Sequence, residues 1–148
     1  MVRNPIVLSV IVALASVITA CDILDIGSHA DPALIVFYND TADIDAPNIV
    51  NVNTDFDVSV TTFAGGCTRH IDHTSFDLRD NVAEIRPFNR TKRSDVCTAD
   101  LLYLVHTVTL RFDRPGVATI RVLGSNWPVD DAAKPNGRTM LERQIIVQ

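Results

Sequence analysis

Residues 102–122 read LYLVHTVTLRFDRPGVATIRV, two runs rich in β-branched and aromatic residues that flank the turn sequence DRPG at 113–116. In an extended strand every second residue shares a face, and the face that runs from Leu102 to Phe112 is apolar apart from His106. Proline and glycine between two such runs favour a tight turn. The stretch therefore predicts two neighbouring antiparallel strands joined as a hairpin.

His106 interrupts this apolar face, so its side chain is expected in the core. A buried histidine is usually neutral, because burial disfavours the charged form, and it is held by a hydrogen bond to a hydroxyl or to the backbone. A catalytic or ligand-binding role is the alternative. That role would require a pocket that joins His106 to a carboxylate and a nucleophile.

The same period of two continues through the rest of the chain, with turn residues every eight to twelve positions and no convincing helical periodicity. The further expected strands are 33–38, 48–53, 55–63, 73–79, 81–88 and 142–148. In the strand at 55–63, Phe56, Val58 and Val60 point to one side and the polar residues between them point to the other. The pattern predicts an all-β chain with a single antiparallel β-sandwich of seven to eight strands.

The last forty residues, with FDRPGVATIRVLG at 112–124 and RQIIVQ at 143–148, are similar to the closing strands of bacterial immunoglobulin-like domains. This resemblance implies an immunoglobulin-like arrangement of the sandwich. Because many β-sandwiches share such a pattern, it implies nothing about a ligand.

The first twenty residues have the layout of a secretory signal, with one charge at Arg3 and an apolar run from Ile6 to Val17 that is too short to span a bilayer. The sequence ITAC at 18–21 resembles the lipobox of bacterial lipoproteins, which implies cleavage before Cys21 and lipidation of its thiol. An ordinary secretory leader is the alternative. The expected organisation is a signal peptide at 1–20, a lipidated N-terminus and short tether at 21–32, and a β-sandwich domain at 33–148.

Charge limits the possible partners. The leader holds one basic and no acidic residue, so the remainder carries 12 Lys and Arg against 18 Asp and Glu. Proteins that bind nucleic acid need a basic surface. We therefore expect no nucleic-acid partner, contact with the membrane through the lipid on Cys21, and an envelope protein or a glycan as a possible partner.

The sequence CTRHIDH at 67–73 contains three residues that can bind a metal, namely Cys67, His70 and His73. Copper or zinc would require a thiolate at Cys67. Cys97 is the only other cysteine besides Cys21, and two cysteines in an exported domain usually pair. The primary expectation is a disulfide between Cys67 and Cys97, with no cofactor. A metal site at His70 and His73 is the alternative.

No nucleophile elbow, phosphate loop or EF-hand pattern is present, so we expect no enzymatic activity. Two segments are candidates for partner binding. One is 124–138, which contains Trp127, either as an exposed anchor or as a plug for the end of the sandwich. The other is NRTKRSDVC at 89–97, with Arg90, Lys92 and Arg93, which either receives an acidic partner or is only a charged loop.

These features together predict a lipoprotein of the bacterial cell envelope, anchored through Cys21 and facing the periplasm or the exterior. Its β-sandwich would be a non-catalytic binding or structural module. The alternative function is that of an exported metal-binding or redox protein that uses Cys67, His70 and His73.

Overall fold

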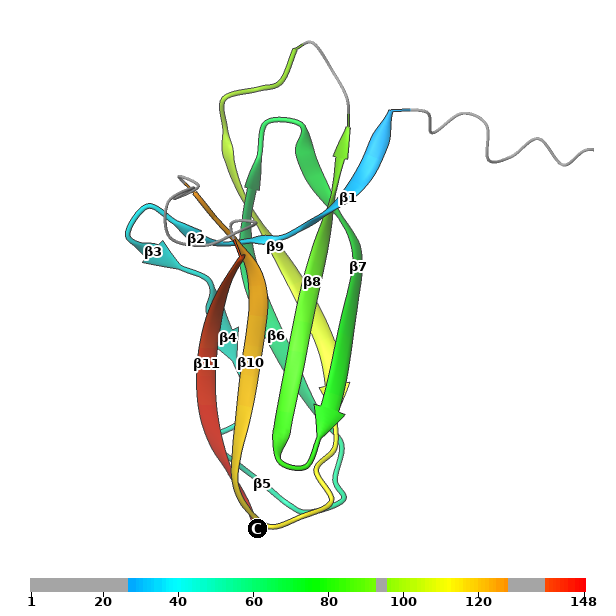
Figure 1. The fold of residues 1–148 in the computed structure, drawn as a ribbon, viewed down its shortest axis with the longest axis vertical. Coiled ribbons are helices and arrows are strands. Elements are labelled where there is room, and N and C mark those ends of the chain that lie inside the picture. The colour runs from blue at the N-terminus through cyan, green and yellow to red at the C-terminus, as the bar shows by residue number, and fades with distance from the viewer. Residues whose placement is uncertain (1–26, 93–95, 128–137) are drawn as a thin grey trace, which may run out of the picture.

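The computed structural model describes residues 27–92, 96–127 and 138–148, and within these ranges it contains eleven strands and no helix. The all-β prediction is confirmed. Figure 1 shows the strands, which are β1 (Ser28–Pro32), β2 (Leu34–Phe37), β3 (Asp40–Thr41), β4 (Asp43–Asp45), β5 (Ile49–Val50), β6 (Phe56–Gly65), β7 (Thr68–Arg79), β8 (Val82–Lys92), β9 (Leu101–Leu110), β10 (Gly116–Trp127) and β11 (Arg138–Val147). The predicted leader, Cys21 and Arg93 lie outside the described residues.

Five of the strands close into a barrel. β2 pairs with β6 and with β10, while β8 pairs with β10 and with β7. One residue pair, Gly65 with Thr68, joins β6 to β7 and completes the ring. The immunoglobulin-like sandwich is not confirmed, because its two sheets would remain separate.

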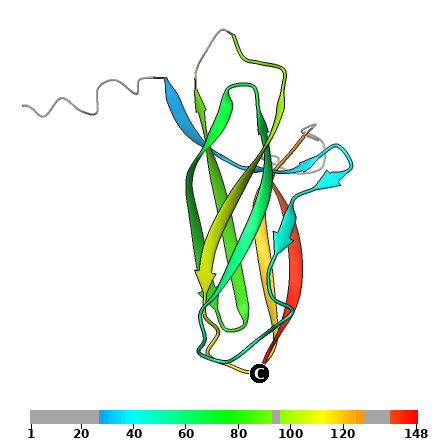
Figure 2. The same cartoon turned by 180° about the vertical axis from the view of Figure 1, so that it is seen from behind.

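The barrel is flattened and has two broad faces. β7, β8, β10 and β11 lie on the face seen in Figure 1, and β4, β6 and β9 lie on the face seen in Figure 2. The turn from β7 to β8 and the crossover from β9 to β10 lie at one end, which we call the closed end. The turn from β6 to β7 lies at the other.

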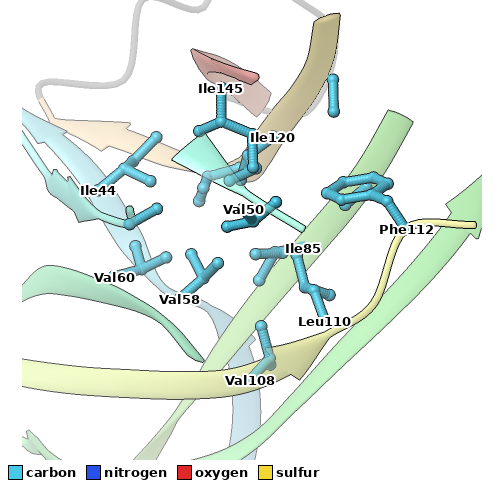
Figure 3. Close-up of a cluster of buried hydrophobic side chains, with 14 of the residues drawn as sticks. Ile44, Val50, Val58, Val60, Ile85, Val108, Leu110, Phe112, Ile120 and Ile145 are labelled. Atoms are coloured by element: carbon cyan, nitrogen blue, oxygen red, sulfur yellow. The ribbon is translucent and has the colours of Figure 1, made fainter. Parts of the chain in front are cut away.

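Both faces contribute alternate residues to one hydrophobic core (Figure 3). Val58 and Val60 of β6 are fully buried and Phe56 packs against the cluster, whereas Asp57 is exposed. The alternation predicted for this strand is therefore confirmed. Burial of each such aliphatic side chain stabilises the fold by about 1.5–3 kcal/mol.

The connection at 113–116 is a crossover between the two faces, so the hairpin prediction is wrong. β9 pairs with β6 along its whole length, whereas β10 pairs with β8, β2 and β11. The physical reason is that both flanking runs have a buried apolar face. When the two runs lie on opposite faces of the barrel, Leu110 and Ile120 are buried in the same core. Phe112 is buried beneath the crossover, and its ring stacks on that of Phe56 with the centroids 5.9 Å apart.

Residues 28–32, which lie in the expected tether at 21–32, form a strand in the structure. This strand, β1, pairs antiparallel with β8 from Ser28 opposite Lys92 to Pro32 opposite Phe88. The sequence SHADP lacks the β-branched and aromatic residues that mark a strand. These residues therefore adopt a strand conformation because they pair with β8, and not because of their own strand propensity.

Candidate functional site

A cleft of about 820 Å³ opens at the end of the barrel opposite the closed end, which we call the cleft end. Aliphatic, aromatic and glycine residues dominate its lining. The lining residues are Asp31, Pro32, Leu34, Phe37, Phe63, Ala64, Gly65, Gly66, Thr68, Asn89, Thr91, Ala99, Asp100, Leu101, Ser125, Asn126 and Trp127. A volume and a lining of this kind are typical of ligand-binding sites.

Two glycines allow backbone segments to approach closely enough to form the cleft walls. A Cβ atom at Gly65 would overlap the carbonyl oxygen of Asp100, so only glycine lets the segment before β9 lie against the end of β6. A Cβ atom at Gly124 would collide with Ala33, where the chain from β1 to β2 crosses β10. The walls therefore come from segments that are far apart in the sequence.

Aromatic rings form one wall. The rings of Phe37 and Phe63 lie 5.8 Å apart, and Tyr103, which does not line the cleft, packs on Phe63 at 5.9 Å. Trp127 ends β10 beside them with 51% of its surface exposed, and its carbonyl accepts a hydrogen bond of 2.6 Å from the backbone N–H of Tyr38. An exposed tryptophan beside aromatic rings is well suited to bind an apolar group.

The rim near the β6–β7 turn is held by a cysteine pair and an ion pair. Cys67 and Cys97 lie at disulfide distance, with their Cα atoms 5.0 Å apart. Arg69 forms an ion pair of 2.8 Å with Asp100. Hydrogen bonds from the Thr98 hydroxyl and from Arg69 keep the pKa of Asp100 below its usual value, so this carboxylate stays charged at neutral pH.

A buried polar cluster borders the cleft from inside the barrel. His106 of β9 is only 2% exposed, with Nδ1 2.7 Å from the hydroxyl of Thr74 and Nε2 3.0 Å from Oδ1 of Asn89. Burial lowers the pKa of His106 to about 4, so the ring is neutral at neutral pH. The prediction of a neutral core histidine bonded to a hydroxyl is confirmed. Asn89 also lines the cleft, whereas His106 and Thr74 do not.

The segment CTRHIDH does not bring its three possible ligands together. Cys67 precedes β7 and lies beside Cys97. His73 bonds Asp72 at 2.6 Å and stacks on Phe88 at 4.5 Å, and His70 is exposed. Within residues 27–92, 96–127 and 138–148, no three His, Cys, Asp or Glu residues lie together as metal ligands would.

The residues predicted to bind a partner fall in different places. Trp127 lines the cleft and is half exposed. Arg90 is bound to Asp72 at 2.7 Å, and the hydrogen bonds of His73 and Arg90 to Asp72 hold the pKa of this carboxyl below its usual value. Lys92 is exposed at the end of β8. Arg93, like the lipidation residue Cys21, lies outside the described residues.

Sequence reasoning missed Phe37 and Phe63 among the cleft residues, and it included Asn89 only as the first residue of the segment 89–97. For Phe63 the sequence held a signal, because a large aromatic residue falls on the polar side of its strand. In the structure this side chain is only 5% exposed. A large aromatic residue on the outward side of a strand indicates a second packing surface. For Asn89 the sequence held no signal, since its role depends on His106, which lies on another strand.

No family model, curated protein or solved structure matches this chain. In the part of the chain that the structure describes, no helix has the length and apolar character needed to cross a membrane.

Proposed function

We propose that this protein is a lipid-anchored module of the bacterial cell envelope that binds a partner in the cleft without catalysing a reaction. The observation that carries the proposal is the open apolar cleft with the half-exposed Trp127 at its edge. The ITAC sequence at 18–21 supports the anchor. Apolar surface that stays accessible in this way is typical of binding sites.

The buried histidine supports a binding role over a catalytic one. Both ring nitrogens of His106 are bonded, one to Thr74 and one to Asn89, and neither partner is a carboxylate. His106 is also absent from the lining of the cleft. A general base must reach the proton that it abstracts, and His106 does not reach the cleft.

The proposed anchor would keep the cleft end near the membrane. Seven positions separate Cys21 from Ser28, where β1 begins, and an extended chain spans at most about 3.5 Å per residue. Ser28 would therefore lie within about 25 Å of a lipidated Cys21. We also propose that the flattened barrel is related to the immunoglobulin-like sandwich, which the alternation of inner residues on its two faces supports.

The anchor is tested by the intact mass of the protein extracted from native membranes in detergent, alkylated with and without prior reduction. The expected result is a chain that starts at Cys21, carries acyl mass, and exposes two thiols only after reduction. A chain without acyl mass contradicts the anchor. Free thiols at Cys67 and Cys97 before reduction contradict the disulfide.

The binding role is tested by a photo-reactive amino acid at position 127 in living cells. Val117, also on β10 and 62% exposed, is the matched control at the closed end. We expect discrete cross-linked adducts from position 127 and none from position 117. An absence of adducts from position 127, or the same adducts from both positions, would contradict a binding site in the cleft.

A further inference from the structure

One edge of β1 is open and borders the cleft. β1 pairs with β8 along its other edge, and no other strand among the described residues pairs with it. Asp31 and Pro32 of β1 line the cleft. An open strand edge offers backbone N–H and C=O groups to an added strand. Pro32 lacks an N–H and its carbonyl already accepts a hydrogen bond from the Ser125 hydroxyl at 3.1 Å, so this pairing is limited to the residues before it.

Asn89, which lines the cleft, carries a buried hydrogen-bond donor. Because His106 is neutral, it carries one ring proton, and the proton on Nε2 is donated to Oδ1 of Asn89 while Nδ1 accepts from Thr74. The Nδ2 atom of Asn89 then has no partner among the described residues, although the side chain is only 1% exposed. A buried amide without an acceptor is costly, and a carbonyl group in the cleft would satisfy it.

The charge of the lining limits the ligand further. Among the described residues that line the cleft, the charged ones are Asp31 and Asp100, both acidic. Asp100 stays ionised at neutral pH because of Thr98 and Arg69. Both acidic residues have an ion-pair partner, His29 at 3.0 Å from Asp31 and Arg69 at 2.8 Å from Asp100, and no basic residue among the described ones lines the cleft. An anionic ligand would therefore find no free counter-charge there, whereas a neutral or basic ligand needs none.

We infer that the cleft binds an extended, apolar, non-acidic peptide segment of a partner protein, which pairs as an added strand with the open edge of β1. The inference rests on the proposed binding function and names its ligand class. The peptide places apolar side chains against Phe37, Phe63 and Trp127, and one of its carbonyl groups accepts a hydrogen bond from Nδ2 of Asn89. Strand addition fits these observations because it uses an open edge and a side-chain pocket together.

The test uses the full chain in detergent micelles and an array of synthetic nonapeptides that alternate apolar residues with threonine. The peptide ends carry lysine, serine or glutamate. We expect binding of peptides with lysine or serine ends and weaker binding of those with glutamate ends. N-methylation of alternate peptide nitrogens removes backbone donors, and we expect it to reduce affinity by about tenfold or more.

Two variants tie the binding to the cleft. Ala99→Trp fills the cleft from an exposed segment, and we expect it to abolish peptide binding, while Val117→Trp introduces the same side chain at the closed end and leaves binding unchanged. Asn89→Asp keeps the acceptor for His106 but replaces the donor with a carboxylate oxygen, and we expect a loss of about tenfold. If Asn89→Asp does not fold, Ala99→Trp and the N-methylated peptides still decide the question.

The outcomes separate this inference from the proposed function. If N-methylated peptides bind as well as unmodified ones, or if no peptide binds in a way that Ala99→Trp abolishes, the peptide inference is wrong. Adducts from position 127 in cells would then show that the cleft binds a partner of another class. If position 127 gives no adducts and no peptide binds, both proposals are wrong.

Discussion

The closed end and the cleft end of the barrel differ in what lies between the two faces. At the closed end the space is filled by aliphatic and aromatic side chains, including Phe112, Leu110 and Ile120. Toward the cleft end the buried residues become polar, with Asn89 and His106, and beyond them the cleft opens. The cleft end is therefore stabilised by specific contacts between side chains, whereas the closed end is stabilised by burial of apolar surface.

This difference explains how a chain of 148 residues can keep an open cleft. An unfilled interior gives up the packing that normally stabilises a barrel end. The Cys67–Cys97 pair, the Arg69–Asp100 ion pair and the bonds of His106 replace part of that packing. Removal of an apolar side chain should consequently cost stability mainly at the closed end and binding mainly at the cleft end.

The largest expected effect is at the closed end. Phe112→Ala leaves a cavity under the crossover, because Phe112 is fully buried and stacks on Phe56. We expect the free energy of unfolding to fall by about 3–5 kcal/mol in urea titrations followed by circular dichroism. Leu101→Ala at the cleft end, where Leu101 is 44% exposed, should cost less than about 1 kcal/mol. Equal losses at the two positions would refute the proposed division between the ends.

The second effect is at the cleft end. The double variant Cys67→Ser, Cys97→Ser opens a loop with a sequence separation of 30 residues. In the chain-entropy model this lowers the free energy of unfolding by about 3–4 kcal/mol. Hydrogen exchange should accelerate around 65–68 and 97–101 more than at the closed end. Reductant should destabilise the wild type and leave the double variant unchanged. A wild type that reductant does not affect would argue against the disulfide.

The third effect depends on pH and arises at the boundary between the two ends. The folded-state pKa of His106 is about 4, below its ordinary value of 6.5. Between these values the unfolded chain takes up a proton that the folded chain does not, so stability is complete above pH 6.5 and falls as the pH is lowered toward 4. We expect a loss of about 3 kcal/mol across this window.

Urea titrations at several pH values, on the wild type and on His106→Gln, measure this effect. Glutamine keeps a polar side chain but does not titrate, so the variant should lose most of the pH dependence in this window. His29, His70 and His73 remain in both proteins and serve as an internal control. An identical pH dependence in the two proteins would show that His106 does not carry the effect.

The sequence allowed the closed end to be predicted better than the cleft end. Alternation in a strand depends only on local residue order, so the inner positions of β6 and β9, including His106, could be read from it. The pairing of Cys67 with Cys97 followed from the number of cysteines. The partner of a strand is not local, however, and the DRPG turn at 113–116 therefore suggested a hairpin where the chain crosses between faces.

The cleft could not be predicted because its walls come from separate segments. β1 lies in SHADP, which has no strand propensity and depends on β8 for its pairing. Asn89 gains its role only when β8 packs opposite β9 and His106. Trp127 was identified from the sequence as an exposed anchor or a plug, and the structure leaves it half exposed at the edge of the cleft.

The smallest expected effect on stability is at Trp127, and it should accompany a large effect on binding. Because Trp127 is 51% exposed, Trp127→Ala should lower the free energy of unfolding by less than about 1 kcal/mol. The same variant should weaken binding of the array-selected peptides by about tenfold or more, since exposed tryptophans often anchor partners. Fluorescence anisotropy of labelled peptides measures the affinity.

Tyr103→Ala is the matched control for this last prediction. Tyr103 is also an exposed aromatic residue, at 62%, and packs on Phe63, but it does not line the cleft. Its removal should leave peptide affinity within about twofold of the wild type. If Tyr103→Ala weakens binding as much as Trp127→Ala does, the contact surface is the outer face of β9 and not the cleft. A large loss of stability in Trp127→Ala would instead mean that Trp127 supports the barrel, and the contrast between the two ends would fail at this residue.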